Sequence, residues 1–394
     1  MICCLKSGGE LRVAIFTVVV TILAVAYGAA NFLVISRVGL ALPAGAVRKT
    51  TVSIMVTLAL AYIMGRILEK LLPHAVVSPL IWGGSIWFAV LTYLFFFIAF
   101  SDMLLKLAGL AGMGPGLRGA LEAAVPWCAI VVAVGVSAYG AVVAMIPQVT
   151  RYNFSIAKQA GDIQDLSIAV VSDLHMGNIM GRRRVGRIVS VVNSLHPDLV
   201  LFPGDIVDED LRPVMKQDLG ALLKGINTRY GKFAVTGNHE YIGGAEKAVK
   251  YLESEGIQFL RDKTLTVADS FVLIGREDKS SEYFALKRRK PLEKIMEGVN
   301  GELPLILMDH QPYKLKAAEK AGIDLQLSGH THNGQLWPFN WITKLIYEKS
   351  WGSVKKGSTN IVVSCGAGTW GPPVRVGSIS EIVLIHLHFT GKQN

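Results

Sequence analysis

The feature that most constrains this chain is a set of four long apolar segments within its first 150 residues. Each approaches or exceeds the roughly 20 residues that a helix needs to cross the hydrocarbon core of a bilayer. The segments are Val13–Ile35, Thr51–Leu68, Val77–Phe100 and Ala124–Ile146. Residues 1–150 hold only nine Lys and Arg and four Asp and Glu, whereas the rest of the chain holds 31 and 26. We therefore predict an all-α membrane domain over residues 1–150, with four transmembrane helices.

Charge in and around these segments limits the function classes that fit the chain. Because no ionisable side chain lies near the centre of a segment, we do not expect an ion or proton pathway. Lys and Arg are divided nearly evenly between the loops on the two sides, so the side of the membrane that carries the C-terminal domain stays open. The net charge of +10 accompanies no base-reading motif, and we expect no specific nucleic acid partner. It suits anionic lipid headgroups, so we expect a multi-pass protein of the cell membrane with the lipid bilayer as a partner.

Beyond a polar linker, which we place at residues 151–164, apolar runs of strand length alternate with helical patterns. Such alternation predicts an α/β domain with a largely parallel sheet, which we place at residues 165–394. The tail 360–389 is expected to provide closing strands of a second sheet. The five apolar runs are Leu166–Asp173, Asp198–Asp205, Gly231–Asn238, Glu302–His310 and Ile323–His330.

Polar residues able to bind a metal ion stand at the end of each of the five runs. Ligands of α/β sheets bind beyond the carboxyl ends of the strands, where loops from separate strands converge. Residues i and i+2 of an extended segment project to the same side, so the Asp-x-His and His-x-His pairs are each expected to present two ligands to one small volume. The candidate residues are Asp173, His175, Asp205, Asn238, His239, His310, His330 and His332.

The donor atoms of these residues indicate which metals fit. Carboxylate oxygens mixed with imidazole nitrogens and an amide suit Mn, Fe, Zn or Co better than a structural zinc site or a calcium cage. The donors exceed what one tetrahedral ion takes and suit two divalent ions, about 3.5–4 Å apart, that clamp a phosphate and activate a hydroxide for in-line attack. We expect Mn, with Fe, Zn, Mg or Co as alternatives. Gly204, Gly237 and Gly329 each precede a candidate ligand, where a missing Cβ lets the backbone approach it.

Five short motifs carry a resemblance to a known family. They are Asp173–Gly177 (DLHMG), Gly204–Asp208 (GDIVD), Gly237–Tyr241 (GNHEY), Asp309–Pro312 (DHQP) and Gly329–Gln335 (GHTHNGQ). With the tail GAGTWGPPVRVG, they make Leu166–Phe389 resemble the calcineurin-like metallophosphoesterases, in their membrane-associated bacterial branch. The resemblance implies a four-layer α-β-β-α sandwich that hydrolyses phosphoric ester or anhydride bonds.

The resemblance also implies a role for each motif residue. The residues implied to hold one metal are Asp173, His175 and His332. Those implied to hold the other are Asn238, His310 and His330. Asp205 would bridge the two ions. His239 resembles the histidine of the family that binds no metal and would stabilise the phosphoryl oxygens or protonate the leaving group.

Two further segments bear on the substrate. Arg182, Arg183 and Arg184 begin the helix after the first motif, where their guanidinium groups could meet an anionic substrate or a lipid surface. A solvated helix start is the alternative. The aromatic and apolar segment Leu336–Trp351 follows the last motif, and it could lie on the membrane, form a slot for acyl chains or cover the sheet.

We therefore expect a membrane-anchored phosphoesterase that uses a two-metal-activated hydroxide on a phosphomonoester, phosphodiester or pyrophosphate bond. The substrate is expected to be lipid-linked or envelope-related, and a UDP-2,3-diacylglucosamine-type pyrophosphate is one option. Histidine at position 239 departs from the arginine of lipid A pathway hydrolases in this family. A non-catalytic membrane scaffold or sensor is the alternative from another class, and a degraded ligand set would favour it.

Overall fold

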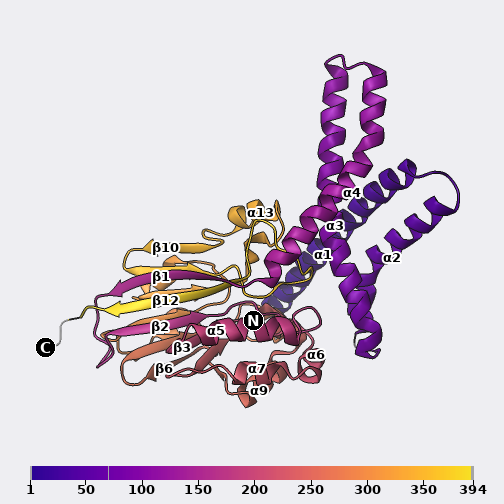
Figure 1. Cartoon of the computed structure of the whole chain (residues 1–394). Helices are drawn as coiled ribbons and strands as arrows, with labels where there is room; N and C mark the ends of the chain where they lie inside the picture. The colour runs from indigo at the N-terminus through magenta and orange to yellow at the C-terminus, as the bar shows by residue number, and fades with distance from the viewer. Residues whose placement is uncertain (1, 70, 392–394) are drawn as a thin grey trace. The chain divides into compact units, whose positions relative to one another are not determined.

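The structure is a computed structural model that describes residues 2–69 and 71–391. The chain divides into two compact units, Met1–Tyr139 and Gly140–Asn394. We call the first the helical unit and the second the sandwich unit. Figure 1 labels the elements of both and draws the helical unit in indigo and violet.

Within the described residues, four helices are long and apolar enough to cross a membrane. They are α1 (Ile2–Ala41), α2 (Ala46–Leu68), α3 (His74–Leu110) and α4 (Pro115–Met145). The last turns of α4 belong to the sandwich unit, because the division between the units falls after Tyr139. The four apolar segments of the sequence fall on these four helices, as predicted.

Close backbone approach and buried polar contacts join the helices of the helical unit. A Cβ added to Gly84 of α3 would lie 2.2 Å from the backbone nitrogen of Tyr62 on α2. Trp87 of α3 donates its indole N–H to Oδ1 of Asn31 on α1 at 2.9 Å. Small residues and interhelical hydrogen bonds are what associate helices in lipid, where the hydrophobic effect does not act between them.

The described part of the sandwich unit contains two six-stranded sheets, in the orders β1-β12-β2-β3-β4-β5 and β10-β11-β9-β8-β7-β6. The first comprises β1 (Gln148–Ile156), β2 (Asp165–Val170), β3 (Leu199–Pro203), β4 (Lys232–Val235), β5 (Gln258–Phe259) and β12 (Glu381–Phe389). The second comprises β6 (Lys263–Val267), β7 (Phe271–Gly275), β8 (Leu305–Met308), β9 (Leu325–Ser328), β10 (Gly352–Lys356) and β11 (Thr359–Val363). The predicted parallel character is present, since β2, β3 and β4 pair in parallel, as do β8 and β9.

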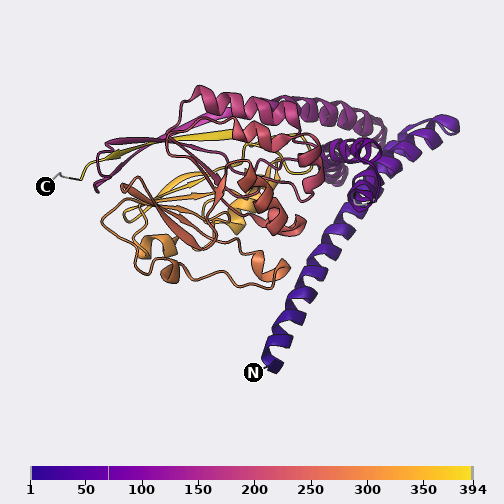
Figure 2. The ribbon, with the colours of Figure 1, turned by 90° about the horizontal axis from the view of Figure 1, so that it is seen from below.

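Helices cover the outer face of each sheet, so the sandwich unit has the expected four layers. On the first sheet, Val185 and Ile188 of α5 (Arg182–Ser194) pack with Phe202 of β3. On the second, Ile295 and Ala318 pack with strands β7 and β8. A third apolar cluster lies between the sheets, and Figure 2 shows the strands in separate layers, the second sheet in orange. Sheets covered on both faces explain the nearly continuous apolar runs of the sequence.

The helices of the sandwich unit are short apart from α5. They are α5 (Arg182–Ser194), α6 (Leu211–Lys216), α7 (Leu219–Lys224), α8 (Asn238–Gly243), α9 (Ala245–Ser254), α10 (Ser281–Phe284), α11 (Leu292–Ile295), α12 (Lys316–Lys320), the 3-10 helix η1 (His332–Gly334) and α13 (Phe339–Ile346). Of these, α5, α7 and α9 cover the first sheet, and α11 and α12 cover the second.

Two expectations about the edges of the domain differ from the structure. Residues 151–164, expected to be a linker, include most of β1, which pairs in parallel with β12. β1 shows no apolar run because it is an edge strand with mostly exposed and half-buried positions. The tail 360–389 was expected in the second sheet, but only β11 lies there, and β12 lies in the first sheet between β1 and β2. Alternation of side chains predicts a strand but not its partner, because the partner is set by tertiary packing.

Candidate metal centre

The candidate residues of the sequence gather at the carboxyl ends of strands from both sheets. Asp173 and His175 follow β2, Asp205 follows β3, Asn238 and His239 follow β4, His310 follows β8, and His330 and His332 follow β9. Because β2, β3 and β4 are neighbours in one sheet and β8 and β9 in the other, these ends meet at one rim of the sandwich. Asn238 and His330 are partly exposed, whereas the other six are buried.

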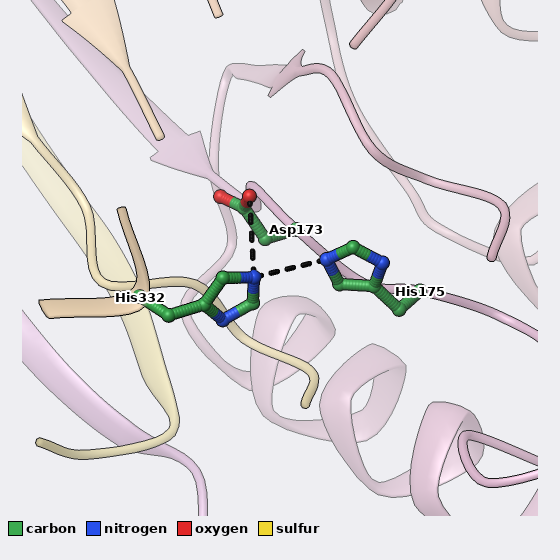
Figure 3. Close-up of side chains that lie close together, drawn as sticks. All are labelled: Asp173, His175 and His332. Carbon is green, nitrogen blue, oxygen red and sulfur yellow. Dashed lines mark hydrogen bonds and ion pairs between the residues drawn. The ribbon is translucent and has the colours of Figure 1, made fainter. Parts of the chain in front are cut away.

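Asp173, His175 and His332 form a first group, whose ligand atoms lie within 4.8 Å of one another. Nε2 of His332 is 3.0 Å from Nε2 of His175 and 3.6 Å from Oδ1 of Asp173. Figure 3 shows the three side chains pointing toward one another. Two imidazole nitrogens and a carboxylate oxygen are a donor set that suits a transition metal. This group could therefore hold a metal ion.

Asp205, His310 and His330 form a second group. Oδ1 of Asn238 joins it, at 3.2 Å from Nε2 of His310 and 2.8 Å from Nδ1 of His330. The other ring nitrogen of His310, Nδ1, lies 2.7 Å from the carbonyl oxygen of Pro203. A carbonyl only accepts hydrogen bonds, so Nδ1 carries a proton and Nε2 is the ring nitrogen that faces the group. Burial opposes a charge on this ring, but Asp205, 3.1 Å from Nε2, outweighs it and raises the pKa of His310 well above its usual value. A metal ion at Nε2 would replace the proton there, while the bond from Nδ1 to the carbonyl would keep the ring in place.

Asp205, a member of the second group, is also near the first group. Its Oδ2 is 3.1 Å from Nε2 of His310 in the second group and 3.9 Å from Nε2 of His175 in the first. Burial opposes ionisation of this carboxyl, but the nearby imidazoles of His310 and His239 outweigh it and hold the pKa of Asp205 well below its usual range. For Asp173, by contrast, burial dominates and raises the pKa. The ionised carboxylate of Asp205 is thus close to imidazoles of both groups. It could therefore serve as a ligand that two metal ions share.

The two ligand pairs converge for a different reason than the extended geometry that we expected. The backbone angle φ is 54°, 48°, 51°, 73° and 48° at Asp173, His175, Asp205, His330 and His332. A left-handed backbone costs a non-glycine residue about 1–3 kcal/mol and persists where the surrounding structure imposes it. The sharp turn sends His330 to the second group and His332 to the first.

Two glycines leave room for the carboxylates. A Cβ added to Gly237 would lie 2.1 Å from Oδ1 of Asp205, and one added to Gly329 would lie 2.1 Å from Oδ2 of Asp173. Real Cβ atoms do not approach oxygen so closely, so only glycine allows these strand ends to reach the carboxylates. The sequence indicated this from the position of each glycine before a candidate ligand.

His239 stands beside the first group and forms a third cluster with Asp208 and His175. Its Nδ1 is 3.2 Å from Oδ1 of Asp208, and its ring meets the His175 ring edge-on, with 4.5 Å between centroids. Burial alone would lower the pKa of His239, but the carboxylates of Asp205 and Asp208 raise it to about 9. A protonated imidazole at this place can donate a proton or stabilise an oxyanion. Asp208 was not among our candidates, although it ends the GDIVD motif.

Glu240 is a buried carboxylate that the sequence analysis also missed. Its oxygens accept hydrogen bonds from the backbone N–H groups of Asp205, Val207 and Gly237, at 3.0, 2.9 and 2.7 Å. These bonds join the loop after β3 to the loop after β4. Burial, together with the charge of Asp205, raises the pKa of Glu240 to about 6. Its place directly after the histidine of GNHEY was the available signal.

Arg375 is a fully buried cation behind the first group. Its Nη2 donates to the carbonyls of Cys365 and Gly368 at 2.8 and 2.6 Å, and lies 3.2 Å from Nδ1 of His332. Arg375 therefore holds His332 against the loop that precedes β12. Its signal in the sequence was a lone arginine among apolar residues and glycine in the tail PPVRVG.

The arginine run at the start of α5 lies outside the three clusters. Arg182 donates from Nη1 to the carbonyls of Gln217 and Asp218, at 3.1 and 3.3 Å. Arg182 and Arg183 are exposed, and Arg184 is partly exposed. Burial, together with the charge of a neighbouring arginine, lowers the pKa of Arg184. The run thus lies on the outer helix layer.

The region of the chain that is similar to known proteins contains the candidate metal centre. The calcineurin-like phosphoesterase family matches residues 166–334, which include every candidate ligand at the strand ends. The chain is 35% identical to an uncharacterized metallophosphoesterase of Helicobacter pylori, over 57% of this chain and 60% of that protein. It is 32% identical to a transmembrane protein with metallophosphoesterase domain of Danio rerio, over 66% of this chain and 62% of that protein. The chain thus spans about three fifths of the length of these two relatives.

A third relative is covered more fully. The uncharacterized metallophosphoesterase YkuE of Bacillus subtilis is 30% identical, over 57% of this chain and 79% of that protein. Sequence similarity of this extent accompanies the four-layer sandwich and the carboxylate and imidazole groups at its rim. The chain belongs to the calcineurin-like metallophosphoesterase family.

Proposed function

We propose that this chain is a membrane-anchored, metal-dependent hydrolase of a phosphomonoester, phosphodiester or pyrophosphate bond. The observation that carries the proposal is Asp205, an ionised carboxylate flanked by two groups of imidazoles and carboxylates at one rim of the sandwich. Four helices long and apolar enough to cross a membrane support the anchoring. We place the protein in the cell membrane as a multi-pass protein, with the bilayer as its partner.

The proposed cofactor is a pair of divalent metal ions, Mn before Fe, Zn, Mg or Co. The proposed ligands of one ion are Asp173, His175 and His332. Those of the other are Asn238, His310 and His330, and Asp205 is shared. Such ions neutralise phosphoryl oxygens and lower the pKa of water. The hydrogen bond from Nδ1 of His310 to the carbonyl of Pro203 supports this assignment, because it orients the ring with Nε2 toward the group.

His239 is the residue of this chain that we propose to move a proton. Its Nδ1 faces the carboxylate of Asp208, so Nε2 is the atom left to meet the substrate. The raised pKa keeps the ring protonated near neutral pH. A proton on Nε2 can then pass to the oxygen of the leaving group, which would otherwise depart as a strong base. Asp208 fixes the ring orientation during that transfer.

For the substrate we propose a phosphate carried by a lipid or an envelope precursor, with UDP-2,3-diacylglucosamine-type pyrophosphate as one option. A membrane-anchored site meets such molecules first. Arg182, Arg183 and Arg184 remain proposed contacts for an anionic substrate, and the exposure of the first two supports that role. A non-catalytic scaffold or sensor is the alternative, and the complete set of strand-end carboxylates and imidazoles favours hydrolysis over it.

The test is hydrolysis of an aryl phosphodiester and an aryl phosphomonoester by the full chain in detergent with Mn²⁺. Asp205→Asn should lose at least about 10³-fold in rate, because several kcal/mol of charge stabilisation disappear. His239→Ala should lose about 10²-fold yet keep its metal content. Asp165→Asn, an exposed carboxylate on β2, is the matched control and should be unchanged. Equal rates in all four proteins would rule out the proposed function.

A further inference from the structure

The segment after the last motif histidine presents apolar side chains to solvent. None of the residues of α13, all of which the structure describes, is buried. Trp341 is 58% exposed and Leu345 is 87% exposed. Large apolar side chains normally pack inside a soluble domain, so such exposure marks an interaction surface. This surface, which we call the α13 surface, consists of Trp337, Trp341, Ile342, Leu345, Ile346 and Trp370.

Specific contacts hold the α13 surface together. The rings of Trp337 and Trp341 pack edge to face, with 5.5 Å between centroids. The side chain of Gln335 donates to the carbonyl of Trp370 at 2.9 Å and accepts from its backbone N–H at 3.0 Å. The loop that carries Trp370 is thereby fixed to the segment that leads into α13. The apolar side chains therefore form one surface rather than separate exposed residues.

The α13 surface continues directly into the candidate metal centre. Tyr347, the residue after α13, has its ring 5.9 Å from the ring of His330. On the other side, the ring of Trp370 lies 5.8 Å from the ring of His239. Aromatic residues thus connect the exposed apolar side chains to both the second group and the proposed proton donor. A surface that the α13 side chains contact would lie next to the reacting phosphate.

We propose that the α13 surface lies in the lipid–water interface of the membrane in which the chain is anchored. Trp and Tyr favour that interface because one end of each ring is apolar and the other polar, and the exposed Lys344 suits anionic headgroups. The same chain holds four helices that could cross a membrane. The last of them ends at Met145, and β1 begins at Gln148, so a helix of membrane length leads directly into the first strand of the sandwich unit.

This inference rests on the proposed membrane anchoring and deepens the proposed function, because it favours a phosphate borne by a lipid of the same bilayer. It does not depend on turnover. A lipid headgroup at the interface would reach Asn238 and His330, the two partly exposed residues of the site, without leaving the membrane. Water-soluble esters would need no such contact.

The test places one fluorescent probe on α13 in the full chain, reconstituted into vesicles of phosphatidylcholine and phosphatidylglycerol. Cys3, Cys4 and Cys128 are changed to Ser, while the buried Cys365 is kept. Leu345→Cys then carries an environment-sensitive dye. The matched control is Glu246→Cys on α9, whose side chain is 81% exposed in the outer helix layer. Both positions are exposed enough for the change to leave the fold intact.

Quenching then distinguishes lipid from water. The Leu345→Cys probe should emit at shorter wavelength, lose fluorescence to brominated lipids and be shielded from iodide supplied on both sides of the membrane. The Glu246→Cys probe should behave in the opposite way. Quenching of the Leu345→Cys probe by iodide but not by brominated lipid would overturn the proposal. Shielding from both quenchers would overturn it too, because a protein surface, from a second copy or from this chain, would then cover α13. Since no outcome depends on hydrolysis, failure here is separate from failure of the proposed function.

Discussion

In the helical unit large apolar side chains face outward, whereas in the sandwich unit charged side chains lie inside. Phe32 on α1 is 76% exposed, while Asp173 and Arg375 are fully buried at the rim of the sandwich. The first arrangement suits helices long and apolar enough to cross a membrane, because apolar surface is stable in lipid. The second is stable only when each buried charge is paired, hydrogen-bonded or bound to a metal. The helical unit thus depends mainly on close packing of its helices. In the sandwich unit, polar contacts determine the geometry of the candidate metal centre.

This difference predicts that the two units respond separately to change. Hydrogen exchange, measured peptide by peptide, reports the stability of each region through its own protected amides. Peptides from α2 and α3 report on the helical unit, and peptides from β2, β3 and β9 report on the sandwich unit. A change at the site should therefore alter protection in the strands alone.

Among the changes that leave every proposed ligand in place, Gly237→Ala should have the largest effect on hydrolysis. The added Cβ would lie 2.1 Å from Oδ1 and 2.6 Å from the backbone nitrogen of Asp205, so Asp205 must move. Displacement of a reacting group by about 1 Å costs about 10²-fold in rate, and we expect at least that loss in aryl phosphodiester hydrolysis. Protection should fall in β3 but not in α2 or α3.

The matched control for this change is Gly186→Ala in the middle of α5. A Cβ there meets nothing within 4 Å, and alanine in a helix is favoured over glycine by about 0.5–1 kcal/mol. The control should keep full activity and be slightly more stable. If both variants hydrolyse the ester at the rate of the unaltered chain, the close approach at Gly237 has no part in shaping the site.

Removal of the metal ions should destabilise the sandwich unit alone. Ligands present at 100 times their dissociation constant stabilise the folded state by about 2.7 kcal/mol, which a chelator would remove. Without the ions, the buried Asp173 and Asp205 depend on the neighbouring imidazoles and backbone N–H groups alone. We expect weaker protection in β2, β3 and β9, restored by Mn²⁺. Equal loss of protection in α2 and α3 would show that the two units are not independent.

Arg375→Lys should weaken one of the two metal sites. Lysine keeps the charge but lacks the planar fork with which Arg375 contacts the carbonyl of Gly368 from Nε, Ser378 from Nη1 and His332 from Nη2. Arginine only donates, so its contact orients the His332 ring without accepting the ring's proton. Loss of outer contacts typically costs 10–100-fold in metal affinity, and we expect the low end, about 10-fold, for the first group. Calorimetric titration with Mn²⁺ should show one weakened step and one unaltered step.

The exposed Arg182→Lys is the control for this change, because its carbonyl contacts lie on the outer helix layer. It should leave both steps unaltered. A purely structural role of Arg375 would weaken both steps alike, and that result would remove the specific link between this arginine and His332.

The sequence predicted the strand ends and placed the eight candidate residues after them, because each motif directly follows an apolar run and order along the chain is local information. It missed Asp208 of the third cluster. It did not predict the left-handed backbone of Asp173 and His175, which contacts with neighbouring loops impose. It also missed Arg375 and Glu240, whose site partners lie 43 and 35 residues away in the chain. The sequence also did not predict strand β1, because an edge strand with exposed positions carries no apolar run.

Asn31→Leu should have the smallest effect, and it lies in the helical unit. Oδ1 of Asn31 accepts the indole N–H of Trp87 at 2.9 Å in a buried contact. Hydrogen bonds between membrane helices average only about 0.6 kcal/mol, because separated helices also find polar partners. We expect slightly weaker protection in α1 and α3, and unaltered hydrolysis and metal binding. A double-mutant cycle that combines Asn31→Leu with Trp87→Phe isolates the interaction energy between the two side chains. If Asn31→Leu alone slowed hydrolysis, packing of the helices would reach the metal centre, and the two units would have to be treated as one.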